Sequence, residues 1–287
     1  MYDIIIIGAG PAGISASLYC KRAGMKVLVL YHGTSELQKA YKIDNYYGFP
    51  EGITGEELYN NGINQAKKLG VEVLEKEVTN IEIEDNLCFN VKTINESFEA
   101  KAIIIATGNK KVRPNIEGVE EFEGKGISYC AICDGFFYRN KNVAIIGNGE
   151  FAISEAKDLE NVVNNILILT NGNEAPIIDK YKTDIRKIRK INGNEKVDSI
   201  EFEDGEKIDI DGIFVAEGIA GGASFAKKLG IITKGDNIEV NRNMETNIPG
   251  IFACGNLTGG LLQINKAVYE GAKAGLQAVN YIKNKEE

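Results

Sequence analysis

The chain has 287 residues, and its 44% apolar content is enough to fill the packed cores of one large domain or two ordinary ones. Its formal net charge of −8, with charges of both signs spread along the chain, argues against a protein that binds nucleic acid or an anionic membrane. The longest apolar runs are far shorter than the roughly 20 residues of a membrane-spanning helix. Met1 leads straight into a strand pattern without a signal peptide, so we expect a globular protein of the cytoplasm.

The N-terminal segment has the order strand, glycine turn, helix, strand. Residues 2–7 predict a buried parallel strand, residues 14–22 an amphipathic helix, and residues 26–30 the next strand. The first turn, Gly8-Ala9-Gly10-Pro11-Ala12-Gly13, has its glycines in the GxGxxG spacing. Such a turn lets the backbone approach a pyrophosphate, whose charge the helix N-terminus attracts. The acidic residue that often ends the second strand is absent, so the residue that binds the ribose stays unassigned.

The same order returns in the middle of the chain. Residues 142–146 predict a strand, residues 153–159 a helix and residues 166–169 the following strand. The turn between the first two is Gly147-Asn148-Gly149-Glu150-Phe151-Ala152. Two such units predict an α/β fold with two Rossmann-like dinucleotide-binding domains.

Two segments have the composition of linkers, at residues 113–118 and 243–249. A helical run at residues 262–281 follows the second linker, and we expect this final segment to complete the first domain. The expected boundaries are 1–112 and 246–287 for the first domain, and 113–245 for an inserted central domain.

The five cysteines include one close pair, Cys130-Ala131-Ile132-Cys133. Two cysteines at this spacing can close a small disulfide or share a metal, and a helix that starts there lowers the pKa of a thiol. Zinc would need two more ligands, which the isolated cysteines and the one histidine, His32, do not offer at a second short spacing. Redox chemistry is therefore favoured, and no metal is expected. Asp134 could protonate the thiolate formed on reduction, although a helix-capping or surface role is the alternative.

The segment Cys-Ala-Ile-Cys-Asp-Gly-Phe-Phe-Tyr at residues 130–138 resembles the active-site signature of low-molecular-weight thioredoxin reductases. The GxGxxG start, the Ala-Thr-Gly segment at 106–108 and the FAxGD-like segment at 252–256 also resemble that family, and the match runs nearly end to end. The resemblance implies FAD as cofactor, a thioredoxin-type protein as substrate and a homodimer. It also implies that the central domain swings so that its disulfide faces either the flavin or the substrate.

The resemblance further implies the roles of individual residues. Cys133 would face the flavin, Cys130 would exchange with the partner disulfide, and Asp134 would be the acid. The residues implied to hold FAD are Gly8, Gly10, Ala12, Gly13, Asn45, Ala106, Thr107, Gly108, Gly255, Asn256, Gln263 and Ile264.

Several positions depart from the family pattern. NADPH-dependent members carry His and Arg after the second strand of the central domain to bind the 2′-phosphate, whereas residues 169–174 here contain no cation. Glu150 adds a negative charge to the second glycine turn, so we predict that this turn no longer binds a dinucleotide. Near the flavin, Asn256 replaces the usual Asp, and Leu262 stands where an Arg commonly precedes Gln263.

These departures resemble the ferredoxin-dependent branch of the flavoprotein thioredoxin reductases. We hypothesise that a small acidic iron–sulfur protein, or a flavodoxin, reduces the flavin. The basic residues that could meet it are Lys110, Lys111 and Arg113, or an expected helical run with Arg186, Lys187, Arg189 and Lys190, for which a solvated helix face is the alternative.

Three alternative functions are compared with the ferredoxin-dependent reductase. An NADPH- or NADH-dependent reductase with an atypical nucleotide site is favoured by the retained GxGxxA spacing of Gly147, Gly149 and Ala152. A non-catalytic regulator that binds flavin or a disulfide has no positive sign in the sequence. A ferredoxin–NADP reductase of the same architecture is disfavoured because it has no need of the cysteine pair.

Overall fold

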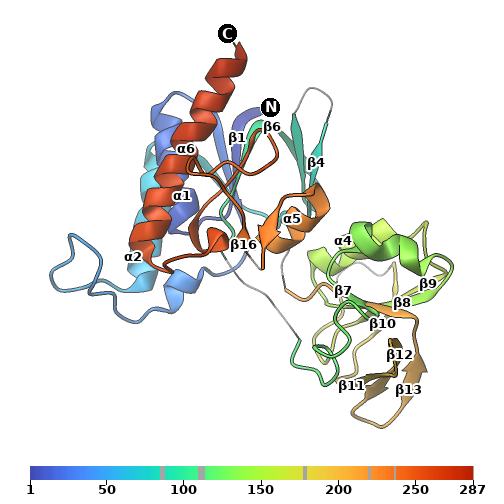
Figure 1. Cartoon of the computed structure of the whole chain (residues 1–287). Coiled ribbons are helices and arrows are strands. Elements are labelled where there is room, and N and C mark those ends of the chain that lie inside the picture. Colours follow the sequence, from blue (N-terminus) through green and yellow to red (C-terminus); the bar gives the residue numbers. More distant parts are fainter. Residues whose placement is uncertain (85–87, 109–113, 177–179, 219–220, 236, 287) are drawn as a thin grey trace. The chain divides into compact units, whose positions relative to one another are not determined.

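The computed structural model describes residues 1–84, 88–108, 114–176, 180–218, 221–235 and 237–286 (Figure 1). The chain divides into two compact units, which we call unit 1 (Met1–Lys110 and Gly221–Glu287) and unit 2 (Lys111–Ala220). Unit 2 therefore ends at Ala220 and not at the expected boundary at residue 245. The additional residues belong to unit 1 because α5 (Gly222–Leu229) packs against β4 (Asn80–Ile83) of that unit.

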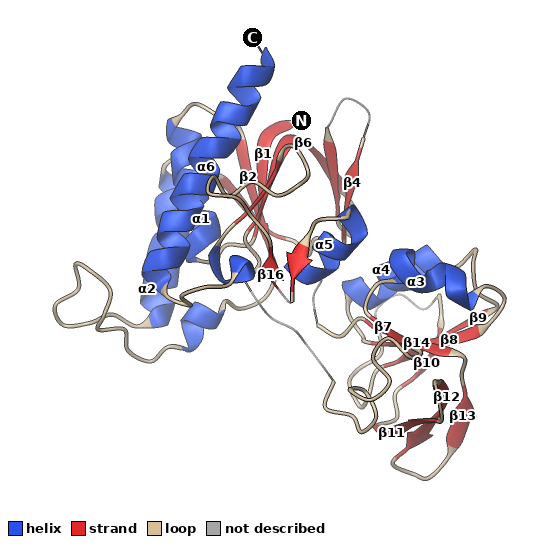
Figure 2. Ribbon diagram, viewed as in Figure 1, coloured by secondary structure: helices blue, strands red, loops and turns tan. Residues whose placement is uncertain are grey.

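Unit 1 is built on a seven-stranded sheet with helices packed on it (Figure 2). Its order is β3-β2-β1-β6-β5-β4, and β17 also pairs with β6. The remaining strands are β1 (Tyr2–Ile7), β2 (Val27–Tyr31), β3 (Glu72–Glu75), β5 (Phe89–Lys92), β6 (Ser97–Ile105) and β17 (Ile251–Ala253). Strands β4 and β5 form an antiparallel end, whereas the other neighbours run parallel. The isoleucine runs of β1 and β6 fill the core because a parallel sheet is covered on both faces.

The other elements of unit 1 are α1 (Pro11–Arg22), α2 (Gly55–Lys68), α6 (Ile264–Glu286), η1 (Glu36–Lys39), η4 (Gly255–Thr258) and a short hairpin of β15 (Thr233–Lys234) and β16 (Asn237–Ile238). Helices α1 and α6 lie side by side (Figure 1). Glycine permits this approach, because a Cβ atom at Gly271 would lie 2.0 Å from the carbonyl oxygen of Ala12 and one at Gly275 would lie 2.7 Å from that of Ala16. The C-terminal helix thus packs directly on the helix that follows the first glycine turn.

Unit 2 contains a five-stranded parallel sheet of order β10-β9-β8-β14-β7 and a separate antiparallel sheet of order β11-β12-β13. The strands are β7 (Ile127–Ser128), β8 (Asn142–Ile146), β9 (Asn165–Leu169), β10 (Lys182–Asp184), β11 (Ile188–Gly193), β12 (Val197–Phe202), β13 (Lys207–Asp209) and β14 (Gly212–Val215). Its helices are α3 (Ala131–Asp134), η3 (Gly135–Tyr138) and α4 (Glu150–Leu159). The predicted α/β class with two Rossmann-like units is confirmed.

Two local predictions are wrong. The basic run at residues 186–190 is not helical, because it leads into strand β11, where Ile188 and Ile191 are buried on one face. The expected linkers are packed segments where the structure describes them: Glu117 pairs with Lys190 in a β-bridge, and Met244, 8% exposed, belongs to the core of unit 1. None of the helices in the described part of the chain combines the length and apolar character needed to span a membrane.

Candidate active site

The first glycine turn connects β1 to α1 in unit 1. Gly8 has a φ of +113°, and a Cβ atom there would lie 2.3 Å from the carbonyl oxygen of Ala106. A Cβ atom at Gly13 would lie 1.9 Å from the carbonyl oxygen of Gly8. Gly8 is therefore required where the turn meets the end of the neighbouring strand β6, and Gly13 where α1 packs against the turn.

Gly10 serves a different purpose. A Cβ atom there would meet only the Ser35 hydroxyl, at 3.8 Å, so the turn is open at this point. Gly10 caps α1 without a side-chain hydrogen bond, and the first turn of α1, which lies within the described residues, contains no acidic side chain. The free N–H groups and the dipole of α1 thus face open space without a competing negative charge, which fits the pyrophosphate of a dinucleotide cofactor.

Contacts within unit 1 join several of the other predicted cofactor residues to distant parts of the sequence. The side-chain amide of Asn45 donates to the Gln263 side chain at 3.3 Å, although 218 residues separate them. Ala106 follows β6 and its N–H donates to Ile7 at 2.8 Å, while the Thr107 hydroxyl accepts the N–H of Gly222 at 3.0 Å. Ala106 and Thr107 therefore lie at the first glycine turn, against the Cβ position of Gly8, and Asn45 and Gln263 meet each other within unit 1.

The remaining predicted residues lie on the same part of unit 1. Ala12 packs against the η4 turn, because a Cβ atom at Gly255 would lie 2.9 Å from the Ala12 Cβ. Asn256 is half-buried in η4, and Ile264 begins α6. Gly108 has a φ of +73° with open space around its Cβ position.

An acidic residue that the sequence interpretation missed lies near the end of β2. Glu77 is 5% exposed, and its Oε2 lies 3.9 Å from Nε2 of His32, the residue after β2. The backbone N–H of Lys76 donates to the carbonyl of Tyr31 at 2.7 Å, which holds the two strand ends together. Glu77 therefore occupies the edge where an acidic side chain from β2 itself was expected.

The cysteine pair lies in unit 2, at the start of α3. Cys130 is 1% exposed and is part of a disulfide, whereas Cys20, Cys88 and Cys254 are free thiols. The side chain of Cys133 lies outside the described side chains.

A hydroxyl bridge that the sequence did not predict holds the backbone beside this disulfide. The Ser128 hydroxyl accepts the N–H of Cys130 at 3.1 Å and donates to Oδ2 of Asp134 at 2.6 Å. The N–H of Asp134 in turn donates to the carbonyl of Cys130 at 3.2 Å. Ser128 thereby fixes the Asp134 carboxylate next to the Cys130 backbone.

A second residue that the sequence did not predict, Glu155, forms a hydrogen bond to the backbone of the same loop. It comes from α4, is 1% exposed, and accepts the N–H of Ala131 at 2.6 Å through its Oε2 atom. Because Ala131 lies between the two cysteines, this buried carboxylate fixes the backbone of the redox loop.

Apolar side chains beside the disulfide extend into solvent. Ile132 is 51% exposed, Phe136 71% and Phe137 70%, and the two phenylalanine rings lie 6.4 Å apart in an edge-on arrangement. Exposed aromatic residues next to a buried redox group are typical of a surface that contacts another protein.

The second glycine turn differs from the first in its charges. A Cβ atom at Gly147 would lie 2.2 Å from the carbonyl of Ala216, so this turn is closely packed as well. However, Glu150 lies in the first turn of α4, and Glu217 directly follows Ala216. Burial raises the pKa of the Glu217 carboxyl group. Glu150 thus places an acidic side chain at the helix N-terminus that would face the phosphates of a dinucleotide, and Glu217 follows a residue whose carbonyl lies against the turn.

The loop after β9 is closed on itself. The Thr170 hydroxyl donates to the carbonyl of Asn173 at 2.6 Å, and the Asn173 amide donates to the carbonyl of Thr170 at 2.8 Å. One cation does approach this loop, because the side chain of Lys187 lies against Gly172, where a Cβ atom would be 2.6 Å from the Lys187 Cγ. The sequence interpretation missed Lys187 at this place, since it comes from a later segment.

Three of the four described basic residues considered for docking are engaged in ion pairs. Arg186 pairs with Asp184 at 2.7 Å, Arg189 with Glu201 at 3.0 Å, and Lys190 with Glu117 at 2.8 Å. Lys110, Lys111 and Arg113 lie outside the described residues.

The thiols give a first testable prediction. Burial raises the pKa of Cys20 to about 12, and burial followed by the charge of Glu270 raises the pKa of Cys254, so neither thiol should react near neutral pH in the native protein. Unfolding the oxidised protein in an alkylating reagent should label three cysteines, and prior reduction should raise this to all five. Mass spectrometry gives the counts, and five labelled cysteines without reduction would show that the disulfide is absent.

The comparisons with known proteins agree with this arrangement. The pyridine nucleotide-disulphide oxidoreductase family matches residues 2–271. The thioredoxin reductase of Aquifex aeolicus (strain VF5) is 32% identical over all of this chain and 95% of that protein. The atypical thioredoxin reductase TRi from Desulfovibrio vulgaris Hildenborough superposes with a TM-score of 0.93 at 39% identity, with 99% of each chain covered. A ferredoxin-flavin thioredoxin reductase from Clostridium acetobutylicum gives a TM-score of 0.74 at 32% identity, with 100% of this chain and 99% of that chain covered. The chain therefore belongs to the pyridine nucleotide-disulphide oxidoreductase family and, within it, to the FAD-binding thioredoxin reductases.

Proposed function

We propose that the Cys130–Cys133 disulfide receives two electrons from bound flavin and passes them to the disulfide of a thioredoxin-type protein. The observation that supports this proposal is the disulfide of Cys130, which lies on a loop that Ser128 and Glu155 hold by hydrogen bonds. FAD, when bound, supplies the two-electron store that the side chains lack.

The exchange itself follows ordinary thiol chemistry. Reduction breaks the Cys130–Cys133 bond and consumes two electrons and two protons, one of which Asp134 supplies to the thiolate that forms. The Cys130 thiol then loses its proton, and the resulting thiolate attacks the partner disulfide and releases one partner sulfur, which takes up a proton as a thiol. Attack by Cys133 on the mixed disulfide releases the second partner thiol and restores the starting disulfide. The exposed side chains of Ile132, Phe136 and Phe137 would meet the partner protein.

We propose that the first glycine turn and its neighbours hold the FAD. Gly8, Gly10 and Gly13 would admit the pyrophosphate to the N-terminus of α1, with Ala12 beside them. Asn45, Gln263 and Ile264 would meet the flavin ring. The remaining cofactor contacts would come from Ala106, Thr107, Gly108, Gly255 and Asn256.

We propose ferredoxin, or a flavodoxin, as the electron donor in place of a pyridine nucleotide. Glu150 puts an acidic side chain in the first turn of α4, at the second glycine turn, and the Thr170–Asn173 hydrogen bonds close the loop that would hold the ribose. Both features disfavour a dinucleotide, whose phosphates need donors and positive charge.

Stopped-flow spectroscopy of the FAD-loaded protein tests the donor. We expect reduced ferredoxin to bleach the flavin absorbance rapidly, while NADPH and NADH leave it oxidised over the same time. Rapid bleaching by either nucleotide would refute the ferredoxin proposal without touching the disulfide chemistry.

One observation favours the second candidate function, an NADPH-dependent reductase with an atypical site. Lys187 lies against Gly172 and could reach a 2′-phosphate near the end of β9. If this candidate is correct, Lys187→Met should raise KM for NADPH by about tenfold and leave KM for NADH unchanged, because one charge-assisted hydrogen bond is lost.

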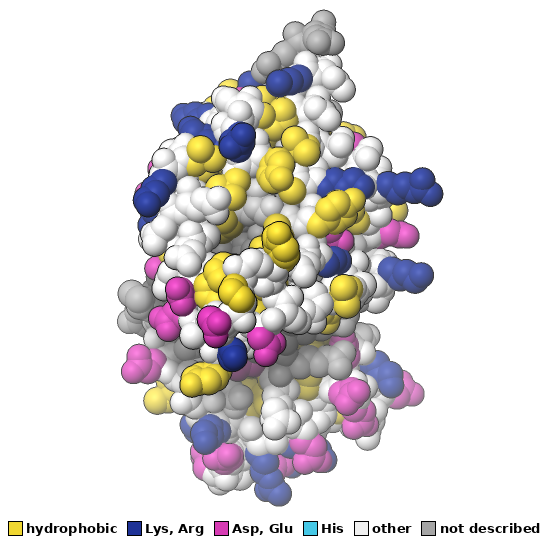
Figure 3. Space-filling model, turned by 90° about the vertical axis from the view of Figure 1, so that its left-hand side faces the viewer, with side chains coloured by type: hydrophobic (Ala, Val, Ile, Leu, Met, Phe, Trp, Pro, Cys, Tyr) yellow, Lys and Arg dark blue, Asp and Glu magenta, His cyan; other side chains and the backbone are white. Residues whose placement is uncertain are grey.

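We also propose a cytoplasmic homodimer. The free thiols of Cys20, Cys88 and Cys254 fit a reducing compartment. Exposed apolar side chains on the helices of unit 1, among them Tyr19, Tyr269 and Leu276, offer a surface for a second copy, and Figure 3 shows hydrophobic side chains gathered on a face of this unit.

A further inference from the structure

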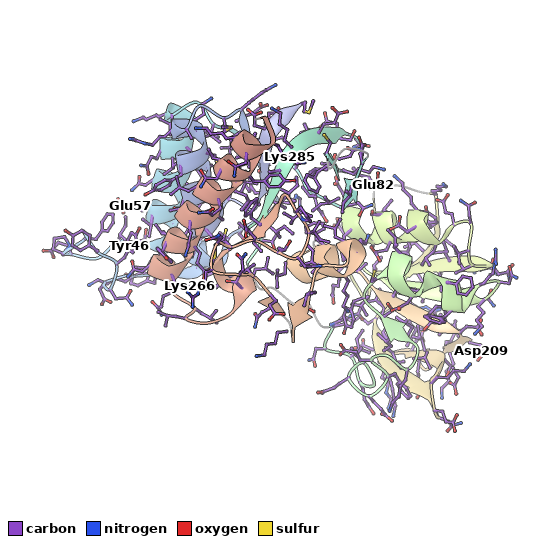
Figure 4. The ribbon with its side chains drawn as sticks, turned by 45° about the horizontal axis from the view of Figure 1, so that its top comes forward. Tyr46, Glu57, Glu82, Asp209, Lys266 and Lys285 are labelled. Carbon is purple, nitrogen blue, oxygen red and sulfur yellow. The ribbon has the colours of Figure 1, made fainter. Side chains whose placement is uncertain are left out.

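A partly buried lysine contacts the η4 turn of unit 1. Lys266 belongs to the first turn of α6, and its side chain is 15% exposed (Figure 4). Its ammonium group donates to the carbonyl of Gly255 at 2.8 Å, to the Thr258 hydroxyl at 3.0 Å and to the carbonyl of Gly259. An ammonium group has three donors, so these contacts use its full capacity.

Glu270 neutralises this lysine one helical turn later. Its Oε2 lies 3.0 Å from the Lys266 Nζ, and the Glu270 side chain is 12% exposed. The same oxygen accepts the N–H of Gly255 and the hydroxyl of Thr258, both at 2.9 Å. The ion pair therefore contacts both ends of the turn from Gly255 to Gly259. It binds both the carbonyl and the N–H of Gly255, the residue that precedes Asn256.

The turn begins and ends at glycines in a left-handed backbone conformation that other residues rarely adopt. Gly255 and Gly259 have φ angles of +83° and +72°. The turn also touches other parts of the cofactor edge, since Leu257 packs under Gly222, whose N–H binds the Thr107 hydroxyl. A change in the turn would therefore reach both Asn256 and Thr107.

We propose that Lys266 and Glu270 are positioning residues that hold the η4 turn, and with it Asn256, against the flavin. This inference rests on the proposed placement of FAD beside Asn256. It assigns to a partly buried ion pair on α6, between residues four positions apart, a part in the support of the cofactor site.

Titration of the apoprotein with FAD, followed by flavin fluorescence, tests the proposal in the full chain. Lys266→Met should weaken FAD binding by about tenfold or more, because hydrogen bonds from a charged donor to three turn atoms are lost. Lys273→Met is the matched control, because Lys273 lies on the same helix but contacts only the Tyr269 hydroxyl, at 3.4 Å, among the hydrogen bonds of the described residues. An affinity for Lys266→Met within about twofold of the Lys273→Met value would overturn the proposal.

The midpoint potential of the bound flavin separates a specific role of the ion pair from general destabilisation of the fold. General destabilisation would not shift this potential in opposite directions in the two variants. Reduction adds negative charge to the flavin ring, so a nearby uncompensated anion lowers the potential and an uncompensated cation raises it. Lys266→Met should therefore lower the potential and Glu270→Gln should raise it. Shifts of the same sign, or no shift in either variant, would contradict the proposal.

Two further measurements separate the possible failures. If Lys266→Met does not fold, the double variant Lys266→Met/Glu270→Met removes both charges of the ion pair, and it should still bind FAD more weakly than Lys273→Met. Equal affinity would overturn the proposal. If the wild-type protein binds no FAD, the proposed function fails before any variant is compared. If the wild type binds FAD and Lys266→Met matches Lys273→Met, only the ion-pair proposal fails.

Discussion

Replacing Cys130 by Ser should reduce the rate of thioredoxin reduction by about a thousandfold or more, because the attacking sulfur of the exchange is lost. A serine hydroxyl is a far weaker nucleophile near neutral pH and cannot form the mixed disulfide. The substitution is nearly isosteric, so the hydrogen bond from the Cys130 N–H to Ser128 should remain. FAD content should therefore stay at the wild-type level, since Cys130 and the first glycine turn belong to different units.

The rate is measured as the appearance of partner thiols under multiple turnovers, with the donor in excess. Cys88→Ser is the matched control, because Cys88 is a free, half-buried thiol in unit 1, and this variant should keep the wild-type rate. Undiminished partner reduction by Cys130→Ser would instead support a protein whose cysteine pair has no part in turnover.

Two glycine substitutions in the same turn should differ in their effect on the stability of the apoprotein. Gly10→Ala should fold normally, since the nearest heavy atom to its Cβ would be the Ser35 hydroxyl at 3.8 Å. It should nevertheless weaken FAD binding by about a hundredfold, because a methyl group would stand where the phosphates approach the backbone. Gly13→Ala should lower the free energy of unfolding by about 3 kcal/mol or more, since its Cβ would lie 1.9 Å from a backbone oxygen.

Chemical denaturation of both apoproteins and FAD titration measure these two effects separately. A Gly10→Ala protein with wild-type FAD affinity would show that the cofactor does not approach this turn. Gly33→Ala provides a comparison for backbone strain alone, because Gly33 has a φ of +66° but no heavy atom within 4 Å of its Cβ position. It should cost stability without a selective loss of FAD affinity.

The sequence predicts the elements around the glycine turns well because local patterns determine them. The mid-chain strand at 142–146 agrees with β8 at both ends, and the helix after the first turn is found as α1. In both units a buried apolar run must end before the glycines, and a helix must follow to cover the sheet. These constraints act within a few residues and are visible without the rest of the chain.

The prediction of a helix at residues 186–190 fails for a physical reason. Ile188 and Ile191 are three residues apart, which is typical of one face of a helix. In the structure a register shift between Ile188 and Lys190 turns the strand, so both isoleucines face the core of unit 2. A bulge in a strand depends on its partner β12, which a local pattern does not reveal.

The residues that support the redox loop were missed because they carry no motif of their own. Ser128 precedes the cysteine pair at the end of a two-residue strand, and Glu155 lies 24 residues after its partner Ala131. A glutamate in an amphipathic helix is ordinarily a surface residue, and only tertiary packing buries this one to 1% exposure. Lys187 and Glu217 were missed in the same way, since each reaches the second glycine unit from a later segment.

Anaerobic reduction of the FAD-loaded protein by reduced ferredoxin, followed by alkylation and peptide mapping, measures whether electrons leave the flavin for the cysteine pair. The account predicts that two new thiols, at Cys130 and Cys133, appear as the donor is consumed, before any partner protein is added. A fully bleached flavin beside a cysteine pair that stays oxidised would contradict it.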